Sequence, residues 1–333
     1  MKSFDVGIDS YSLQPLNLTP DQVLNWAKQH HADGVHFTEI NRPPDRALDK
    51  IFLRDLSQQA ESASLYLEWG GGQHLPYDTA TWDVKDIYSE NLRAAQEAHH
   101  LGTSIVRSCS GGLMRWADKA PPTEILLMGM TEALVKQRDF LTDLNVTLAI
   151  ELHFEFTTFE LLRLFDRCGA EPGGYLGICL DTMNLLTMLE DPVLGTERIL
   201  PWVVATHAKD GALLLNDEGL VSFTTEIGKG QIDFPRILSL LSTLNRKIRL
   251  SVEDHGGSFA IPIFNLSFLS RFPDLTPTEL SRLIQLAFHG NQGVQEGKAA
   301  PLDRALWPGI CESRVQRGVH YLKQLCGSGP GKE

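Results

Sequence analysis

The stretch Val146-Thr-Leu-Ala-Ile-Glu151 is a short apolar run that ends in an ionisable residue, and three later stretches repeat the pattern. They are Leu176-Gly-Ile-Cys-Leu-Asp181, Val203-Val-Ala-Thr-His207 and Ile248-Arg-Leu-Ser-Val-Glu253. Short apolar runs separated by longer helical patterns are typical of parallel strands that are buried on both faces. We therefore predict four consecutive strands, each of which ends in an ionisable side chain.

The same alternation of strand and helix fills the N-terminal half of the chain. We predict four more strands, at Phe4–Ile8, Val35–Phe37, Leu65–Trp69 and Ile105–Ser108. Helices are expected from Thr19-Pro20 onward and over about 45–63, 86–101, 123–143, 157–167, 192–200, 234–244 and 313–326. Eight strand–helix units in strict alternation predict an α/β fold, a single (β/α)8 TIM barrel, with an open doubly wound sheet as the alternative.

Two connections are longer than such a barrel needs. Residues 208–232 follow the seventh strand and contain Asn216-Asp217-Glu218-Gly219, which is typical of a hairpin turn. Residues 254–312 lie between the eighth strand and the last helix, with a helical pattern at about 277–289. We predict one barrel over 1–333 with long insertions after strands 7 and 8. Gly70-Gly71-Gly72 lacks the spacing of a phosphate-binding loop and is interpreted as a flexible turn.

The composition excludes several classes of partner. Thirty Lys and Arg residues against 42 Asp and Glu give a net charge of −12, which argues against binding to nucleic acid or to an anionic membrane. The apolar runs are shorter than a membrane span, and Met1-Lys-Ser-Phe lacks the apolar region of a secretory signal. The five scattered cysteines indicate reduced thiols, so we expect a cytoplasmic protein.

In a barrel, the side chains at the ends of the last four strands meet at one rim, where barrel active sites are built. Glu151, Asp181, His207 and Glu253 would therefore lie together. Three crowded carboxylates repel one another unless a cation neutralises them. Three carboxylates and one imidazole suit a single divalent metal ion, Mn²⁺ or Mg²⁺, with Co²⁺, Fe²⁺ or Zn²⁺ as alternatives.

These stretches resemble the xylose isomerase-like TIM barrels, the sugar phosphate isomerase/epimerase superfamily. The resemblance spans about residues 4–255 and rests on five motifs and on the segment Gly34-Val-His-Phe-Thr-Glu39. The motifs are Ile150-Glu-Leu-His153, Leu180-Asp-Thr-Met-Asn184, Thr206-His-Ala-Lys-Asp210, Gly228-Lys-Gly-Gln-Ile-Asp-Phe234 and Ser251-Val-Glu-Asp-His255.

The resemblance implies a divalent-metal-dependent isomerase or epimerase, a homo-oligomer, that acts on a sugar, polyol or keto-sugar. The resemblance also implies that Glu151, Asp181, His207 and Glu253 bind the metal. It implies that Glu151 and Glu253 act as the catalytic acid–base pair. A metal chelated by a carbonyl and the neighbouring hydroxyl acidifies the shared C–H and stabilises the enediolate. One glutamate would remove the proton and the other would return it.

Two positions depart from the sugar epimerases of this superfamily. Asn184 stands where many of them have histidine, and Thr157 stands where they often have a second glutamate. The departures leave open a metal-dependent lyase or dehydratase of the inosose, dehydroshikimate or 3-keto-glycoside type, and a hydroxypyruvate isomerase. An endonuclease-IV-like phosphodiesterase would need more metal ligands and a basic groove. A non-catalytic sugar-binding barrel is the alternative from another class.

Six further residues are candidates for substrate contacts because they lie beside the expected rim. They are Arg107, His153, Asn184, Lys209, Asp210 and His255. Five of them also have an ordinary structural alternative: a salt bridge for Lys209 and Asp210, a loop hydrogen bond for the histidines, and an ion pair for Arg107.

Overall fold

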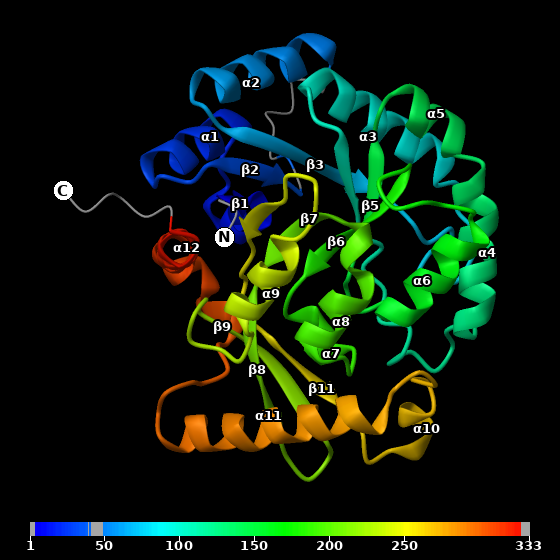
Figure 1. The fold of residues 1–333 in the computed structure, drawn as a ribbon, viewed down its shortest axis with the longest axis vertical. Coiled ribbons are helices and arrows are strands. Elements are labelled where there is room, and N and C mark those ends of the chain that lie inside the picture. The colour runs from blue at the N-terminus through cyan, green and yellow to red at the C-terminus, as the bar shows by residue number, and fades with distance from the viewer. Residues whose placement is uncertain (1–3, 39, 41–48, 328–333) are drawn as a thin grey trace.

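The computed structural model describes residues 4–38, 40 and 49–327, and its centre is a closed barrel of parallel strands (Figure 1). Neighbouring strands follow the order β1-β2-β3-β4-β5-β6-β7-β10 and back to β1. Their bounds are Asp5–Asp9, Gly34–Phe37, Tyr66–Gly72, Ile105–Ser108, Thr147–Glu151, Leu176–Asp181, Val203–Ala208 and Arg249–Val252. The predicted TIM barrel is confirmed.

Helices surround the barrel, as Figure 1 shows. The outer helices are α1 (Pro20–Gln29), α2 (Lys50–Ser62), α3 (Tyr88–Leu101), α4 (Thr123–Val135), α5 (Arg138–Asp143), α6 (Thr158–Arg167), α8 (Pro192–Ile199), α9 (Phe234–Leu241) and α12 (Trp307–Leu325). Short helical elements not foreseen from the sequence are η1 (Ser10–Leu16), α7 (Asn184–Thr187), η2 (Leu200–Trp202), α10 (Leu266–Leu269) and η3 (Arg304–Leu306). Within the described residues, no helix combines the length and apolarity that crossing a membrane requires.

Two predicted helices have different bounds in the structure. The helix expected over 123–143 is broken between α4 and α5, where the buried Gln137 accepts a hydrogen bond from Asn91 Nδ2 at 2.7 Å. The last helix begins at Trp307, six residues before its predicted start, with a proline in its first turn. The predicted start of the second helix, residues 45–48, and Glu39 lie outside the described residues.

The interpretation of Gly70-Gly71-Gly72 as a flexible turn is wrong, because these glycines extend β3. A Cβ on Gly70 would lie 2.7 Å from the carbonyl oxygen of Thr38, and one on Gly72 would lie 2.8 Å from Leu148. The glycines therefore allow close packing of backbone and side chains at the rim.

The two insertions form one accessory layer beside the barrel. The hairpin predicted in 208–232 is present as β8 (Asp210–Leu215) and β9 (Leu220–Thr225), and β11 (Ser258–Ile261) pairs with β9 to give a three-stranded antiparallel sheet. Helix α11 (Pro277–Gln295) packs against β8. Its Gly290 lies so close to the strand that a Cβ there would clash with the carbonyl of Leu213. Buried side chains of this layer belong to the main hydrophobic core.

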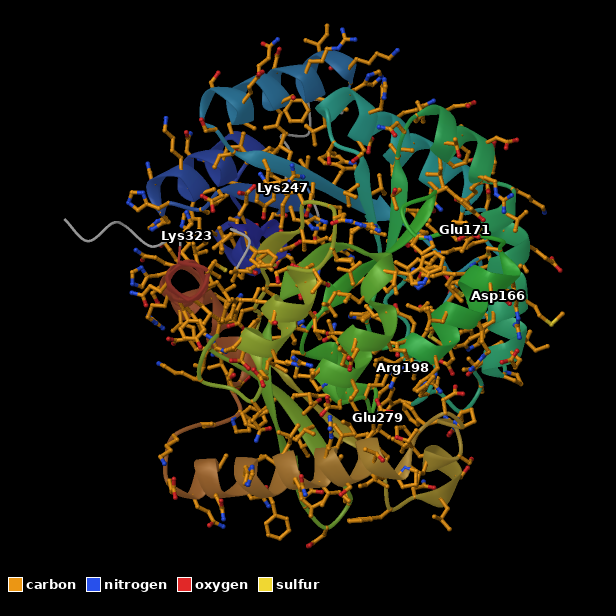
Figure 2. All side chains as sticks on the ribbon, in the orientation of Figure 1. Asp166, Glu171, Arg198, Lys247, Glu279 and Lys323 are labelled. Atoms are coloured by element: carbon orange, nitrogen blue, oxygen red, sulfur yellow. The ribbon has the colours of Figure 1, made fainter. Side chains whose placement is uncertain are left out.

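A buried ion-pair network joins α11 to the barrel helices. Figure 2 shows Arg198 of α8 and Glu279 of α11 near each other across the gap between their helices. The Arg198 guanidinium donates to Glu279 Oε1 and to Glu190 Oε1, each at 2.8 Å, and to Thr158 Oγ1 at 2.6 Å. Both glutamate side chains are at most 4 % exposed. One arginine therefore pairs with two buried carboxylates, and burial raises the pKa of Glu190 to about 7.

The variant Arg198→Ala is expected to destabilise the protein by about 3 kcal/mol, because it leaves two buried carboxylates without their cation. Urea unfolding followed by circular dichroism measures the change. The control is Arg282→Ala on α11, whose 3.7 Å pair with Asp191 is half exposed and should contribute less than about 1 kcal/mol. Equal midpoints for the two variants would show that the network does not anchor α11.

Candidate metal centre

Four side chains converge at the carboxyl end of the barrel. Glu151 ends β5, Asp181 ends β6, His207 lies near the end of β7, and Glu253 directly follows β10. One ligand atom from each residue lies within 4.8 Å of the others, and all four residues are buried. His207 Nδ1 lies 3.0 Å from Glu151 Oε1 and 3.8 Å from Glu253 Oε2. The structure therefore brings together the four residues that the sequence predicted as metal ligands.

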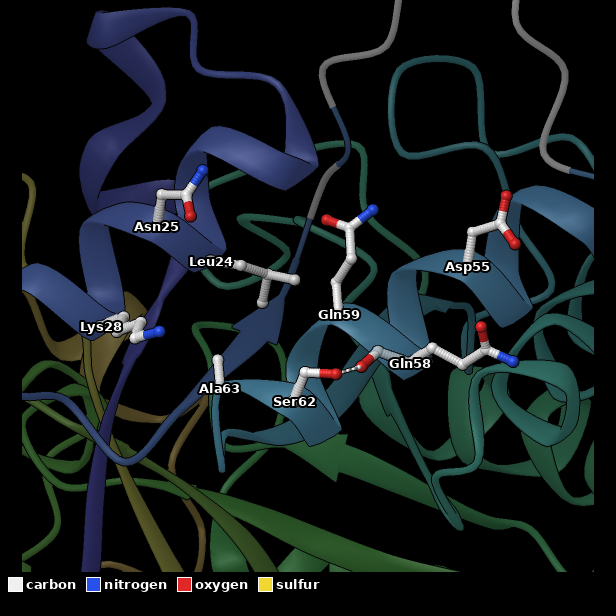
Figure 3. A pocket seen from close by; sticks show the side chains of 8 residues that line it. All are labelled: Leu24, Asn25, Lys28, Asp55, Gln58, Gln59, Ser62 and Ala63. Atoms are coloured by element: carbon white, nitrogen blue, oxygen red, sulfur yellow. Dashed lines mark hydrogen bonds between the residues drawn. The ribbon is translucent and has the colours of Figure 1, made fainter.

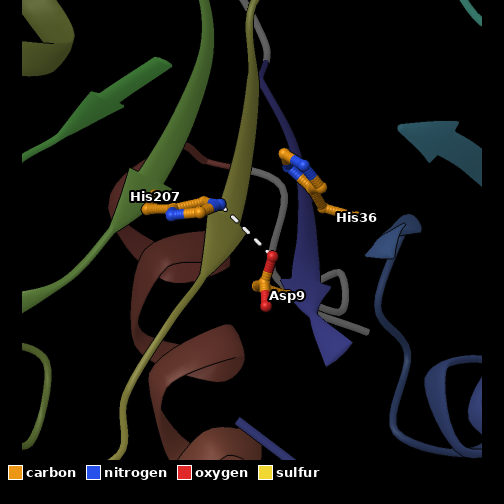
Figure 4. Close-up of side chains that lie close together, drawn as sticks. All are labelled: Asp9, His36 and His207. Atoms are coloured by element: carbon orange, nitrogen blue, oxygen red, sulfur yellow. Dashed lines mark ion pairs between the residues drawn. The ribbon is translucent and has the colours of Figure 1, made fainter. Parts of the chain in front are cut away.

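A fourth carboxylate, which the sequence analysis did not single out, supports His207 from the other side. His207 Nε2 lies 3.2 Å from Asp9 Oδ2, the ion pair drawn in Figure 4. Asp9 is fully buried and also accepts hydrogen bonds from Tyr11 N and the Thr38 hydroxyl. It ends β1 after an apolar run, so the same strand-end pattern could have identified it. A carboxylate on the far nitrogen orients a metal-binding histidine.

Two cations of the chain contact these carboxylates. Arg107 Nη1 donates to Glu151 Oε2 at 3.0 Å, and its Nη2 donates to Thr38 Oγ1 at 2.8 Å. Lys209 Nζ lies 2.8 Å from Glu253 Oε2 and 3.4 Å from Asp181 Oδ2. It also donates to His255 Nε2 at 2.9 Å. The carboxylates are therefore partly neutralised by the protein itself.

These contacts set the pKa values of the carboxyl groups. Burial acts to raise the pKa of Glu151, but Arg107 and His207 outweigh it and hold that pKa well below its usual range. Burial likewise acts to raise the pKa of Glu253, and Lys209 and His207 lower it below its usual value. For Asp181, burial prevails over Lys209 and raises the pKa to about 6. Both glutamates are therefore ionised near neutral pH.

The donor set fits a divalent cation. Three carboxylates and one imidazole are ligands that hard divalent ions accept. Asp9 and the three candidate carboxylate ligands carry four negative charges. Arg107 and Lys209 carry two positive charges, and protonated His207 carries a third, because nearby anionic groups outweigh burial and raise the pKa of His207 well above its usual value. A divalent ion that takes the place of the His207 proton would complete the balance. Nδ1 of His207 faces two of the candidate ligands, and Nε2 faces Asp9, which defines the tautomer that metal binding requires.

A cavity of about 550 Å³ opens above this cluster. Glu151 and Glu253 line it, whereas Asp181 and His207 are not among its lining residues and are fully buried. The accessory segments contribute Phe259 to its wall. A second hollow, between α1 and α2, is shown in Figure 3. Its eight lining residues include a single carboxylate, so it offers no comparable group of ligands.

The cavity includes four of the six predicted substrate contacts: Arg107, His153, Lys209 and His255. It also includes Tyr11, Gln73 and Arg304, which sequence reasoning missed because they come from segments that are far apart in the sequence. Asn184 is not among its lining residues, and its Nδ2 donates to the carbonyl of Leu152 at 3.2 Å.

The structure does not bring Asp210 into the cavity lining either. Its carboxylate accepts four backbone hydrogen bonds, from the N–H groups of Gly211, Gly228, Gly230 and Ile232. Asp210 thus fixes the loop 226–233 that joins β9 to α9. The motif Gly228-Lys-Gly-Gln-Ile232 supplies three of the four donors, and Gly228 has a positive φ of 87°.

The variant Asp210→Asn is expected to lower stability by about 2 kcal/mol, because an amide NH₂ would face two backbone donors in place of a carboxylate oxygen. Thermal unfolding measures the loss. Asp217→Asn in the exposed turn between β8 and β9 removes the same charge and should leave the melting temperature unchanged. Equal melting temperatures for both variants would contradict the structural role of Asp210.

Comparisons with known proteins agree with this architecture. Residues 24–271 match the family model described as xylose isomerase-like TIM barrel. A search of the curated proteins found no significant match. Among solved structures, the fold is similar to that of D-allulose 3-epimerase from Methylomonas sp., with 12% identity, a TM-score of 0.59 and coverage of 98% of this chain and 99% of that chain.

Two other solved structures are similar. An L-ribulose 3-epimerase has 17% identity, a TM-score of 0.59 and coverage of 98% of this chain and 99% of its own. The IolI protein, in a structure with a bound zinc atom, has 15% identity, a TM-score of 0.57 and coverage of 84% of this chain and 99% of its own. At sequence identities of 12% to 17%, the similarity to these three structures shows that the fold is shared.

Proposed function

The chain belongs to the xylose isomerase-like TIM barrel family, and on this premise we propose that it is a divalent-metal-dependent isomerase or epimerase of a sugar or keto-sugar. The observation that carries the proposal is the buried cluster of Glu151, Asp181, His207 and Glu253 beneath a polar cavity. Similar folds belong to proteins described as sugar 3-epimerases, and one similar structure holds zinc.

Four residues would hold the ion: Glu151, Asp181, His207 and Glu253. Asp9 would keep His207 oriented by accepting a hydrogen bond from its Nε2–H group. When bound, the ion would supply Lewis acidity that weakens a C–H bond next to a substrate carbonyl. Mn²⁺ and Mg²⁺ remain our first candidates because oxygen ligands predominate.

Glu151 and Glu253 would move the proton. They are the carboxylates of the cluster that line the cavity, so they can reach a substrate there. Arg107 and Lys209 keep both groups ionised and therefore ready to accept a proton. One glutamate would take the proton from the carbon, and the other would return it to the opposite face or to the neighbouring carbon.

An elimination is the second candidate, and Lys209 is the residue that favours it. Its ammonium group lines the cavity beside Glu253 and would stabilise the negative charge that develops on a departing hydroxyl or glycosidic oxygen. The same initial proton abstraction would then give a lyase or dehydratase. Mass spectrometry of the products separates the reactions, because an epimerase or isomerase conserves the substrate mass in H₂O whereas a dehydratase removes water.

Solvent-deuterium incorporation into a panel of ketoses and keto-polyols tests the proton transfer. We expect incorporation with Mn²⁺ or Mg²⁺, its loss after treatment with a chelator, and its recovery on adding the ion back. Absence of exchange with every metal and every substrate of the panel would contradict the proposed proton abstraction.

Glu253→Gln is expected to reduce the exchange rate by at least about 100-fold, because the amide cannot accept the proton. Glu218→Gln in the exposed hairpin turn is the matched control and should keep the wild-type rate. A Glu253→Gln variant that exchanges as fast as the control would exclude this glutamate from the reaction. Ligand binding without exchange in the wild-type protein would instead support a non-catalytic sugar-binding barrel.

A further inference from the structure

A second group of potential ligands lies on the cavity wall, apart from the four residues of the candidate metal centre. Cys109 follows β4, and His153 and Glu155 follow β5. One ligand atom from each lies within 4.8 Å of the other two. Cys109 and His153 line the cavity, whereas the Glu155 side chain is only 1 % exposed and is not among the lining residues. The group therefore has a buried side and a side open to the cavity.

Contacts around these residues hold them in place. Glu155 Oε2 lies 3.0 Å from His153 Nδ1, and Glu155 Oε1 accepts a hydrogen bond from Gly112 N at 3.2 Å. The backbone of Cys109 donates to the Gly72 carbonyl at 3.3 Å and accepts from Gln73 Nε2 at 3.2 Å. The group is thus fixed by the rim of strands β3 and β4 and by a buried backbone donor.

The chemistry of the group differs from that of the four-residue centre. A thiolate, an imidazole and a carboxylate are the ligands of zinc-type sites, and a thiolate discriminates against Mg²⁺. A thiolate and a carboxylate together carry two negative charges, which a divalent ion neutralises. We propose that Cys109, His153 and Glu155 form a second divalent metal site, for a borderline ion such as Zn²⁺, with its remaining coordination position open to the cavity.

The compactness of the group favours a metal site over a catalytic thiol. In a nucleophile–base–carboxylate relay, the thiol and the carboxylate bond opposite nitrogens of the imidazole, and the ring keeps them apart. Here the sulfur and a carboxylate oxygen lie within 4.8 Å of each other, as do both with one imidazole nitrogen. Three ligand atoms around one point is the arrangement that a bound ion requires.

A neighbouring histidine adds an independent observation. His74 is fully buried, its Nδ1 is bonded to Ser108 Oγ at 2.8 Å, and its Nε2 has no hydrogen-bond partner among the described residues. Its ring lies 6.1 Å from that of Phe156, centroid to centroid, so it packs among the chain neighbours of Glu155 and Cys109. An unpaired buried imidazole nitrogen next to three ligands would be satisfied by a water bound to the ion.

Cobalt substitution tests this site separately from the proposed reaction. The full chain, stripped with a chelator and kept reduced, would be titrated with Co²⁺ alone. We expect a sulfur-to-cobalt charge-transfer absorption in the near ultraviolet that saturates within two equivalents of added Co²⁺, because the four-residue centre also accepts this ion, and whose final intensity corresponds to one cobalt–thiolate bond per chain. It should persist in Glu253→Gln, because the four-residue centre contains no sulfur. Failure of the proposed function would therefore leave this result unchanged.

Two variants and one control test whether the charge-transfer absorption comes from this site. Cys109→Ser should abolish the absorption, and Glu155→Gln should weaken the Co²⁺ affinity of this site by at least about tenfold. Cys326→Ser, at the end of α12, should keep the wild-type absorption and affinity. No charge-transfer absorption at saturating Co²⁺, or an absorption that survives Cys109→Ser, would overturn the proposal.

Alkylation of the unaltered chain gives a test that does not depend on the folding of variants. Zn²⁺ should slow the reaction of Cys109 with iodoacetamide, measured by peptide mass spectrometry, by at least about tenfold, since a coordinated thiolate is withdrawn from reaction. Equal labelling of Cys109 with and without Zn²⁺ would overturn the proposed site.

Discussion

Carboxylate repulsion at the carboxyl end of the barrel is the constraint on which the rest of this structure depends. Asp9, Glu151, Asp181 and Glu253 end or follow four strands of one closed sheet, and each is at most 6 % exposed. Such a group is stable only if nearby positive charge compensates it. Arg107 and Lys209 supply part of that charge, and the proposed divalent ion would supply the remainder.

The four residues of the cluster differ in whether their side chains face the cavity. Glu151 and Glu253 line the cavity, whereas Asp181 and His207 lie behind them. The accessory layer completes the cavity, because Phe259 of β11 and Arg304 of η3 line its wall. Both insertions follow strands that carry candidate ligands. Substrate selection by this protein would thus depend on segments that the barrel itself does not require.

The barrel and the four-residue cluster could be predicted because both follow from local patterns. A parallel strand that is buried on both faces is visible in the sequence as a short apolar run. The ionisable residue at its end is likewise visible without knowledge of the tertiary structure. Asp9 ends β1 in the same pattern, so the same rule applies to it. The three strands and helix α11 of the accessory layer were only partly predictable, since β11 is a four-residue strand whose pairing with β9 is non-local.

The role of a side chain was harder to predict from the sequence than its position in the fold. Asp210 lies next to Lys209 in sequence, yet the two side chains have different roles. The Asp210 carboxylate accepts hydrogen bonds from four backbone N–H groups, three of them in the loop 226–233, whereas Lys209 lines the cavity. Successive residues of an extended segment point to opposite sides, and the sequence alone does not say which side faces the cavity. Gly70 and Gly72 likewise mark close packing that depends on neighbours distant in sequence.

The position of the ion is the most direct test of the central claim. Crystals grown with Mn²⁺ would be measured for anomalous scattering from manganese. The account predicts one strong peak within coordinating distance of Glu151, Asp181, His207 Nδ1 and Glu253. A map with no peak there at saturating Mn²⁺, and with the Lys209 ammonium still between Asp181 and Glu253, would contradict it.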